Sequence, residues 1–175
     1  MTDRNAKKAG RLASIAFIDL EASGLGADSW PIEVGWCFPD SAPCAHLIRT
    51  APAWKDAAWD PKAEALHGVA REELARAGAA PEDVCDALNG ALSGVRVYSD
   101  APDWDGFWLY RLYQAARMRQ AFELWDFRDL FAHLTFDQIN DARAQASAVA
   151  PHRHRAAADV LHMQTLFAMT VRGTA

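Results

Sequence analysis

Two carboxylates stand one residue apart where an apolar stretch of this chain ends. Asp19 and Glu21 close the run SIAFIDLE, which begins at Ser14. In a strand, side chains two residues apart point to the same face, so these two would lie roughly 7 Å apart along the backbone. Two half-buried anions without a partner would cost on the order of several kcal/mol, from desolvation and from their mutual repulsion. We therefore expect both to bind Mg²⁺ or Mn²⁺, the cations that oxygen ligands suit. The alternative is a frayed strand end with both groups in solvent.

A glycine-containing turn follows the two acids. It reads Ser23, Gly24, Leu25 and Gly26. Glycine adopts positive φ without steric cost and lets a ligand come close to the backbone. The sequence thus predicts a strand that runs through two acids into a turn open to a ligand.

A histidine and an aspartate near the end of the chain offer a second chemical pair. His154 precedes Asp159, and the sequence between 156 and about 170 has a helical pattern. Apolar residues at i+4, i+7 and i+8 from Asp159 put this acid on the stripe that faces the core; they are Met163, Leu166 and Phe167. An imidazole titrates near neutral pH and suits general-base catalysis. The alternative is an exposed histidine and an acid that merely favours the helix N-terminus.

Three aspartates lie close together in the middle of the chain. Asp105 shares an apolar helical stripe with residues at i+3, i+4, i+7 and i+11, so we select it as the third acid of the site; they are Trp108, Leu109, Leu112 and Ala116. Asp103 would cap a helix that begins at Trp104. Asp100, just past a strand at 95–99, would contact substrate or support a metal ligand. Which of the three binds metal is left open at this point.

The motifs, in this order, resemble those of the DEDDh 3′-5′ exonuclease superfamily, which includes proofreading exonuclease subunits, oligoribonuclease and ribonuclease T. Residues 19–25 match Asp-x-Glu-x-Ser/Thr-Gly-Leu, and residues 154–159 match His-x-Ala-x-x-Asp. The middle motif departs from the family, because the family has Asn-x-x-Phe/Tyr-Asp and residues 97–109 contain no asparagine. Trp104 and Asp105 resemble the aromatic-Asp pair of that motif.

The resemblance implies a function for each motif. Two Mg²⁺ or Mn²⁺ ions would be held by four acids, namely Asp19, Glu21, Asp105 and Asp159. His154 would deprotonate the attacking water, and hydrolysis would release nucleoside 5′-monophosphates. The 3′-terminal nucleotide would lie on the turn of Ser23, Gly24 and Leu25, with Leu25 as an apolar wedge. His67, in a His-Gly-Val element, and Asp100, in place of the missing asparagine, would lie beside the substrate.

The elements that position these residues begin with strands and continue with helices. Strand-like runs at 13–20, 32–38 and 45–50 suggest a meander. Strands near 95–99 and 124–128 then alternate with helical patterns, which we place at 62–66, 71–77, 81–92, 104–118, 131–134 and 141–150. This order predicts an α/β fold with a mixed five-stranded sheet and flanking helices. It agrees with the ribonuclease H-like fold of the family.

Length and composition fit one catalytic domain. The chain has 175 residues, 51% of them hydrophobic, and no long polar linker. We expect a short polar tail at 1–11 and a single exonuclease domain at 12–175. The tail lacks the apolar core of a signal peptide, and no apolar run reaches the roughly 18 residues that span a bilayer. The expectation is a soluble, cytoplasmic protein without a membrane partner.

The charge narrows the class of substrate. The formal net charge is −5, from 18 basic and 23 acidic residues, which argues against a broad basic surface for long duplexes. Single-stranded DNA or RNA 3′ ends and short oligonucleotides fit better, and the sequence does not separate DNA from RNA. A homodimer is common among free-standing members of the family. The alternative function is that of a nucleic-acid-binding or scaffolding member of the same fold that has lost catalysis.

Overall fold

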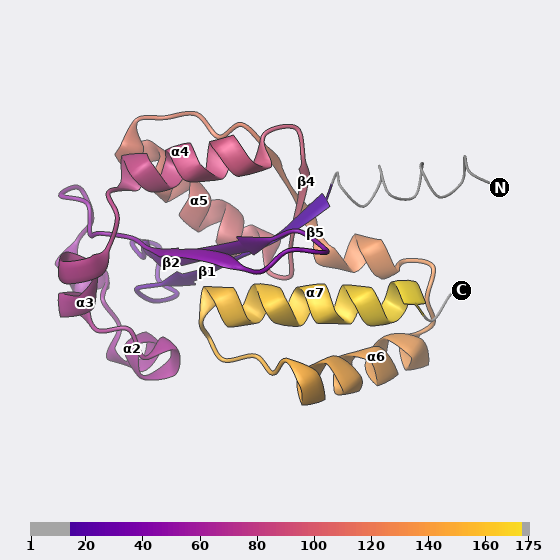
Figure 1. The fold of residues 1–175 in the computed structure, drawn as a ribbon. Helices are drawn as coiled ribbons and strands as arrows, with labels where there is room; N and C mark the ends of the chain where they lie inside the picture. The colour runs from indigo at the N-terminus through magenta and orange to yellow at the C-terminus, as the bar shows by residue number, and fades with distance from the viewer. Residues whose placement is uncertain (1–14, 173–175) are drawn as a thin grey trace.

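A mixed sheet of five strands forms the centre of the molecule (Figure 1). The structure is a computed structural model that describes residues 15–172. The strand order is β3-β2-β1-β4-β5, with the elements β1 (Ile15–Ala22), β2 (Pro31–Cys37), β3 (Cys44–Leu47), β4 (Arg96–Ser99) and β5 (Glu123–Asp126). The first three strands are an antiparallel meander, whereas β4 and β5 run parallel to β1. The α/β, ribonuclease H-like sheet expected from the sequence is confirmed.

Helices cover both faces of the sheet (Figure 1). On one face lie α4 (Pro81–Leu92) and α5 (Pro102–Ala116), and on the other lie α6 (Phe136–Val149) and α7 (Ala156–Arg172). The short helices α2 (Pro61–His67) and α3 (Arg71–Ala77) lie beyond one end of the strands. Two 3₁₀ turns, Asp56–Ala58 and Phe127–Phe131, complete the described elements.

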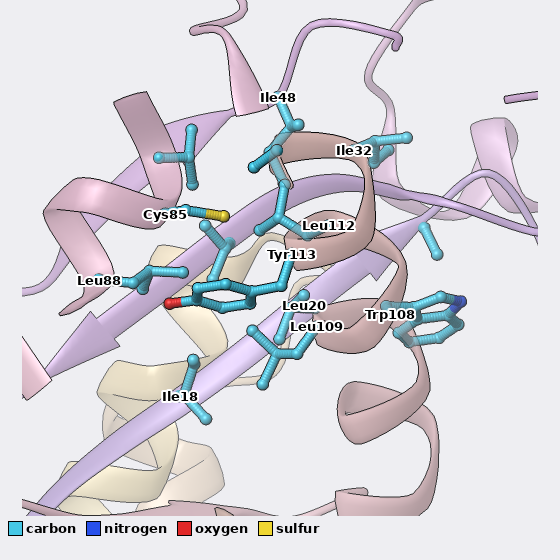
Figure 2. Close-up of a cluster of buried hydrophobic side chains, with 14 of the residues drawn as sticks. Ile18, Leu20, Ile32, Ile48, Cys85, Leu88, Trp108, Leu109, Leu112 and Tyr113 are labelled. Atoms are coloured by element: carbon cyan, nitrogen blue, oxygen red, sulfur yellow. The ribbon is translucent and has the colours of Figure 1, made fainter. Parts of the chain in front are cut away.

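The central strand β1 is apolar on both of its faces. Side chains at even positions, such as Ile18 and Leu20, belong to the core under α4 and α5. Figure 2 shows this core, with Leu109 and Leu112 of α5 pointing toward the strand. Odd positions, such as Phe17, face the α7 side. Because the faces alternate along a strand, Asp19 and Glu21 continue the α7-facing row.

The start of α5 differs from the sequence-based expectation. The helix begins at Pro102 with Ala101 as its N-cap, and no side chain caps it. Asp103 lies within the first turn, so its predicted capping role is wrong. Proline accounts for the difference, because its fixed φ suits the first helical position and it needs no N–H partner there.

The chain between β5 and α7 also differs. The predicted helix at 131–134 is absent, and a 3₁₀ turn spans Phe127–Phe131 instead. Helix α6 begins at Phe136, five residues before the predicted start at 141, because Thr135 and Gln138 form a reciprocal capping box. The predicted strand 124–128 ends at Asp126, whose side chain accepts a hydrogen bond from the Arg128 N–H.

The predicted tail at 1–11 lies outside the described residues. Among the helices in residues 15–172, none is long and apolar enough to cross a membrane.

Candidate active site

Asp19 and Glu21 lie in the half of β1 that approaches the start of α7. Both are half-buried side chains in a strand that is otherwise buried. One oxygen of Asp19, Oδ2, is buried and has no hydrogen-bond partner in the described protein. A buried carboxylate oxygen without a partner is costly, and a bound cation would supply the missing interaction.

Asp19 is one member of a cluster with Asp100 and Asp105. One carboxylate oxygen of each lies within 4.8 Å of the others. Asp105 is buried in the first turn of α5 and accepts a hydrogen bond of 2.5 Å from the Ser99 hydroxyl at the end of β4. Asp100, which follows β4, is exposed. Because β4 pairs in parallel with β1, the two strands bring these acids to the same edge of the sheet.

The second cluster joins Glu21, His154 and Asp159. Their nearest ligand atoms also lie within 4.8 Å of one another. Asp159 is buried in the first turn of α7, and its Oδ1 accepts a hydrogen bond of 2.8 Å from the Arg153 N–H. This hydrogen bond fixes the loop that carries His154. His154 itself has a φ of 53°, at the point where the chain turns toward the helix.

The start of α7 is fixed to β2 by close packing and by a partly buried ion pair. A Cβ atom on Gly35 would lie 2.6 Å from the Ala156 carbonyl carbon, so the helix touches the strand backbone. Glu33 accepts two hydrogen bonds from the Arg155 guanidinium, of 2.9 and 3.0 Å, and one from the Ala156 N–H. Glu33 is also the cross-strand neighbour of Glu21. The contact with β2 and the Arg155–Glu33 ion pair therefore set the positions of Asp159 and His154.

Electrostatics at the two clusters favour a positive ligand. Burial, followed by repulsion from Asp105 and Glu21, holds the pKa of Asp19 well above its usual range. Burial, with repulsion from Asp159 and Glu33, raises the pKa of Glu21 to about 8. Burial also raises the pKa of Asp105 to about 8 although the Ser99 hydrogen bond opposes it. Without a cation these acids would hold protons near neutral pH.

The pKa of Asp159 is shifted in the opposite direction from the pKa values of the other three acids. Burial raises its pKa, but hydrogen bonds from His152 and from the Arg153 N–H outweigh burial and leave that pKa below its ordinary value. His152 Nδ1 lies 3.5 Å from Asp159 Oδ1, and its ring packs on that of His162 at 3.9 Å between centroids.

The sequence analysis did not select His152, Glu33 or Ser99. His152 stands two residues before His154 in the sequence, but only the fold shows that it also reaches Asp159. Glu33 interrupts a strand that is otherwise apolar, a signal that could have identified it. Ser99 has no such signal.

Of the three middle aspartates, Asp100 and Asp105 come together with Asp19, and Asp103 is not part of either cluster in the described residues. Asp103 is exposed on the first turn of α5. The expected substrate residue Asp100 therefore lies among the candidate metal ligands.

In the predicted substrate turn, the Leu25 side chain is exposed, whereas the Ser23 hydroxyl is hydrogen-bonded within the protein. Leu25 is 68% exposed. The buried Ser23 hydroxyl accepts a hydrogen bond from the Trp30 N–H, 3.0 Å, so it shapes the turn. At Gly24 an added Cβ would meet the Asp60 side chain at 3.0 Å.

His67 is buried at the end of α2. Its Nδ1 accepts the Val69 N–H at 3.0 Å, while Nε2 is buried without a partner in the described protein. Burial lowers the pKa of His67, which favours the neutral ring.

These residues fit divalent metal ions. The donors are carboxylate oxygens, which Mg²⁺ and Mn²⁺ prefer. They form two adjoining groups, and one buried oxygen lacks a partner. Repulsion between the acids would be relieved by a cation.

Solved structures of exonuclease I share this architecture. Escherichia coli exonuclease I in complex with a dT13 oligonucleotide has a TM-score of 0.66 and 13% sequence identity, over 90% of this chain and 40% of that one. The zinc-bound E. coli complex with single-stranded DNA has a TM-score of 0.66 at 12% identity, over 91% of this chain and 40% of that one. For Methylocaldum szegediense exonuclease I the TM-score is 0.64 at 18% identity, over 91% and 40%.

The chain thus spans about two fifths of the length of these proteins. No family model matches the sequence, and no curated protein matches it. The identity is low, so the likeness concerns architecture. This chain has the fold of exonuclease I, in agreement with the resemblance of its motifs to those of the DEDDh exonucleases.

Proposed function

We propose that this protein is a metal-dependent 3′-5′ exonuclease that releases nucleoside 5′-monophosphates from single-stranded or short nucleic acid. One observation carries the proposal: four acids from three separate segments converge, with a histidine beside them, at one edge of the sheet. The acids are Asp19, Glu21, Asp105 and Asp159. The fold shared with exonuclease I supports it.

The four acids would hold two Mg²⁺ or Mn²⁺ ions. When bound, such a pair of ions activates a water molecule and stabilises the leaving 3′-oxygen of a phosphodiester. Asp19 lies in one cluster with Asp105, and Glu21 lies in the other with Asp159. Since Asp19 and Glu21 are neighbours on one face of β1, the strand itself sets the spacing between the two clusters. Asp100 would add a further oxygen to the first cluster.

His154 would act as the general base. Its ring lies beside Glu21 and Asp159, on an exposed loop that substrate and water can reach. The neutral ring nitrogen would take the proton of the attacking water, and the two carboxylates would stabilise the imidazolium that forms.

The 3′-terminal nucleotide would lie between the turn after β1 and the end of α2. Leu25, which is exposed, would act as the wedge. Gly24 would contribute by letting the turn pack closely against Asp60. Because Nδ1 of the neutral His67 ring accepts the Val69 N–H, the unpartnered Nε2 carries the proton and would donate it to the sugar or base of that nucleotide. Ser23 would contribute by shaping the turn.

Single-stranded 3′ ends are the proposed substrates. The solved neighbours include exonuclease I bound to dT13, dA16 and single-stranded DNA. The net charge of −5 is consistent with short or single-stranded partners. We make no distinction between DNA and RNA.

The test is a time course on denaturing gels with 5′-labelled single-stranded RNA and DNA of matched sequence. Each is incubated with Mg²⁺, Mn²⁺ or excess chelator, beside an Asp19→Ala variant. The expected result is a ladder that shortens from the 3′ end, needs metal and is lost in the variant. Intact substrate under all conditions, with retained binding, would instead support a binding or scaffolding protein that has lost catalysis.

A further inference from the structure

The segment that joins α6 to α7 carries His154. It spans residues 150–155 and contains no helix or strand. His154 is exposed, and its φ of 53° lies in the left-handed region, which a residue other than glycine adopts at a steric cost. Such a conformation persists only where the surrounding structure fixes it. The contacts that hold this segment therefore decide where the His154 imidazole lies.

His162 contacts this segment from α7. It comes three residues after Asp159, so the two side chains project from the same side of the helix. The His162 side chain is buried, and its Nδ1 lies 2.7 Å from the Ala150 carbonyl oxygen. Because a carbonyl oxygen only accepts hydrogen bonds, Nδ1 must carry a proton and donate it. Burial lowers the pKa of His162, which favours a neutral ring with its proton on Nδ1.

The same ring supports the middle of the segment. The ring of His152 packs on that of His162, with 3.9 Å between centroids and 38° between the ring planes. His152 Nδ1 lies 3.5 Å from Asp159 Oδ1, which also accepts the Arg153 N–H. Two side chains of α7 thus hold the stretch that leads into His154.

The segment beyond His154 is held by a different element. Arg155 and the Ala156 N–H both bind Glu33 of β2. The two ends of the segment are therefore fixed independently, one through β2 and the other through α7. The hydrogen bond from His162 fixes the point at which the segment leaves α6.

We propose that His162 is a positioning residue for the reaction. Its hydrogen bond to Ala150 holds the segment in the conformation that places the His154 imidazole beside the carboxylates of its cluster, where it can accept the proton of the attacking water. The inference rests on the proposed exonuclease function. In this role His162 touches neither metal nor substrate, so it affects the rate of the chemical step and leaves substrate binding unchanged.

Two substitutions separate the hydrogen bond from the ring contact. His162→Phe keeps an aromatic ring against His152 but cannot donate to Ala150. His162→Asn loses the ring but keeps an N–H donor attached to Cγ, as Nδ1 is in histidine. On a single-stranded oligonucleotide at saturating Mn²⁺, His162→Phe should lower kcat about tenfold or more and leave KM within about twofold, because a misplaced general base slows only the chemical step. His162→Asn should recover most of the lost kcat.

A double-mutant cycle with His154→Ala tests whether His162 acts through the general base. If it does, His162→Phe should lower kcat by less than about twofold in the His154→Ala background, since no base is left to misplace. A residue that only supports the fold would lower kcat by the same factor in both backgrounds, and that result would overturn the proposal. A His162→Asn variant as slow as His162→Phe would overturn it too. If His162→Phe does not fold, His162→Gln, whose amide nitrogen lies one bond further out, replaces it in the cycle.

The matched control is His46→Phe. His46 is a half-buried histidine of β3, and its ring stacks on Trp36 at 5.4 Å between centroids. This change should leave kcat and KM as they are. Nitrogen NMR on the unmodified protein tests the contact without any variant, because the His162 ring should carry its proton on Nδ1 near neutral pH. A neutral ring with its proton on Nε2 would contradict the hydrogen bond and with it the proposal.

Failure of the proposed function looks different from failure of the positioning role. If the protein is not an exonuclease, neither the unmodified protein nor His46→Phe hydrolyses any oligonucleotide, and the NMR result for His162 is unaffected. If only the positioning role is wrong, the unmodified protein still degrades oligonucleotides in a metal-dependent way, and His162→Phe does so at the same rate.

Discussion

At the scale of single residues, the middle motif is the clearest test of the site. Asp103 and Asp105 lie two residues apart in the first turn of α5, yet only Asp105 shares a cluster with Asp19. Asp105→Asn should lower kcat by at least about a hundredfold, because it removes a charged ligand from the metal site. Asp103→Asn should change kcat by no more than about threefold, since surface changes have small effects. Steady-state kinetics with both variants decides, and equal losses would refute the assignment.

The raised pKa values of Glu21 and Asp105, each about 8, predict how stability depends on pH without metal. Between the ordinary carboxyl pKa and 8, the folded protein holds protons that the unfolded chain has released. Unfolding then releases protons, so the free energy of unfolding falls as pH rises from about 4.5 to 8. Thermal melts in chelator should therefore show a lower Tm at pH 8 than at pH 6. A Tm that rises over this interval would contradict the burial of these acids.

At the scale of elements, the contact between β2 and α7 holds the site together. Gly35 lies opposite Asp19 in the sheet, and the backbone of Ala156 rests directly on it. Glu33, two residues earlier, binds Arg155 and the first turn of α7. The position of His154 and Asp159 thus depends on a glycine and a glutamate that do no chemistry.

Gly35→Ala should separate α7 from β2. The new methyl group would lie 2.6 Å from the Ala156 carbonyl carbon, an overpacking that costs about 1–3 kcal/mol of unfolding free energy. Because Asp159 and His154 would shift with the helix, kcat should fall as well. Denaturant unfolding and kinetics measure the two effects. For stability, Gly26→Ala is the matched control, since an added Cβ there has no atom within 4 Å. Unchanged stability in Gly35→Ala would show that the packing is looser than the structure indicates.

At the scale of the whole molecule, the proposed metal ions would join three elements that are distant in sequence. Asp19 and Glu21 belong to β1, Asp105 to α5 and Asp159 to α7. These helices lie on opposite faces of the sheet (Figure 1). Ions bound at their common edge would therefore stabilise the fold as a whole.

Mn²⁺ at 100 times its Kd should stabilise the folded state by about 2.7 kcal/mol. For a chain of this length the corresponding rise in Tm is about 5–10 °C. Differential scanning fluorimetry with Mn²⁺ or chelator tests this, with Asp159→Asn as the variant that should respond less. A Tm that ignores Mn²⁺ would contradict the metal site. Light scattering in solution would test separately whether the protein forms a homodimer.

Local pattern in the sequence was enough for much of the fold and for the selection of the candidate acids. The alternation of β1 and the helical stripe of α7 placed Asp19, Glu21 and Asp159 next to the core, because such periodicities depend only on neighbours in the chain. The order of strands and helices predicted the mixed sheet for the same reason. Helix starts at Pro102 and Phe136 were missed, although Pro102, Thr135 and Gln138 are themselves local signals.

Only the tertiary structure decided which groups meet. Asp100 joins Asp19 because β4 pairs in parallel with β1, and Glu33 reaches Arg155 across 122 residues of sequence. The contact of His152 with Asp159 likewise depends on how the loop before α7 folds back on that helix. The sequence by itself determined which acids lie next to the core and therefore need a partner of opposite charge. Their partners follow from long-range packing, which no local periodicity encodes.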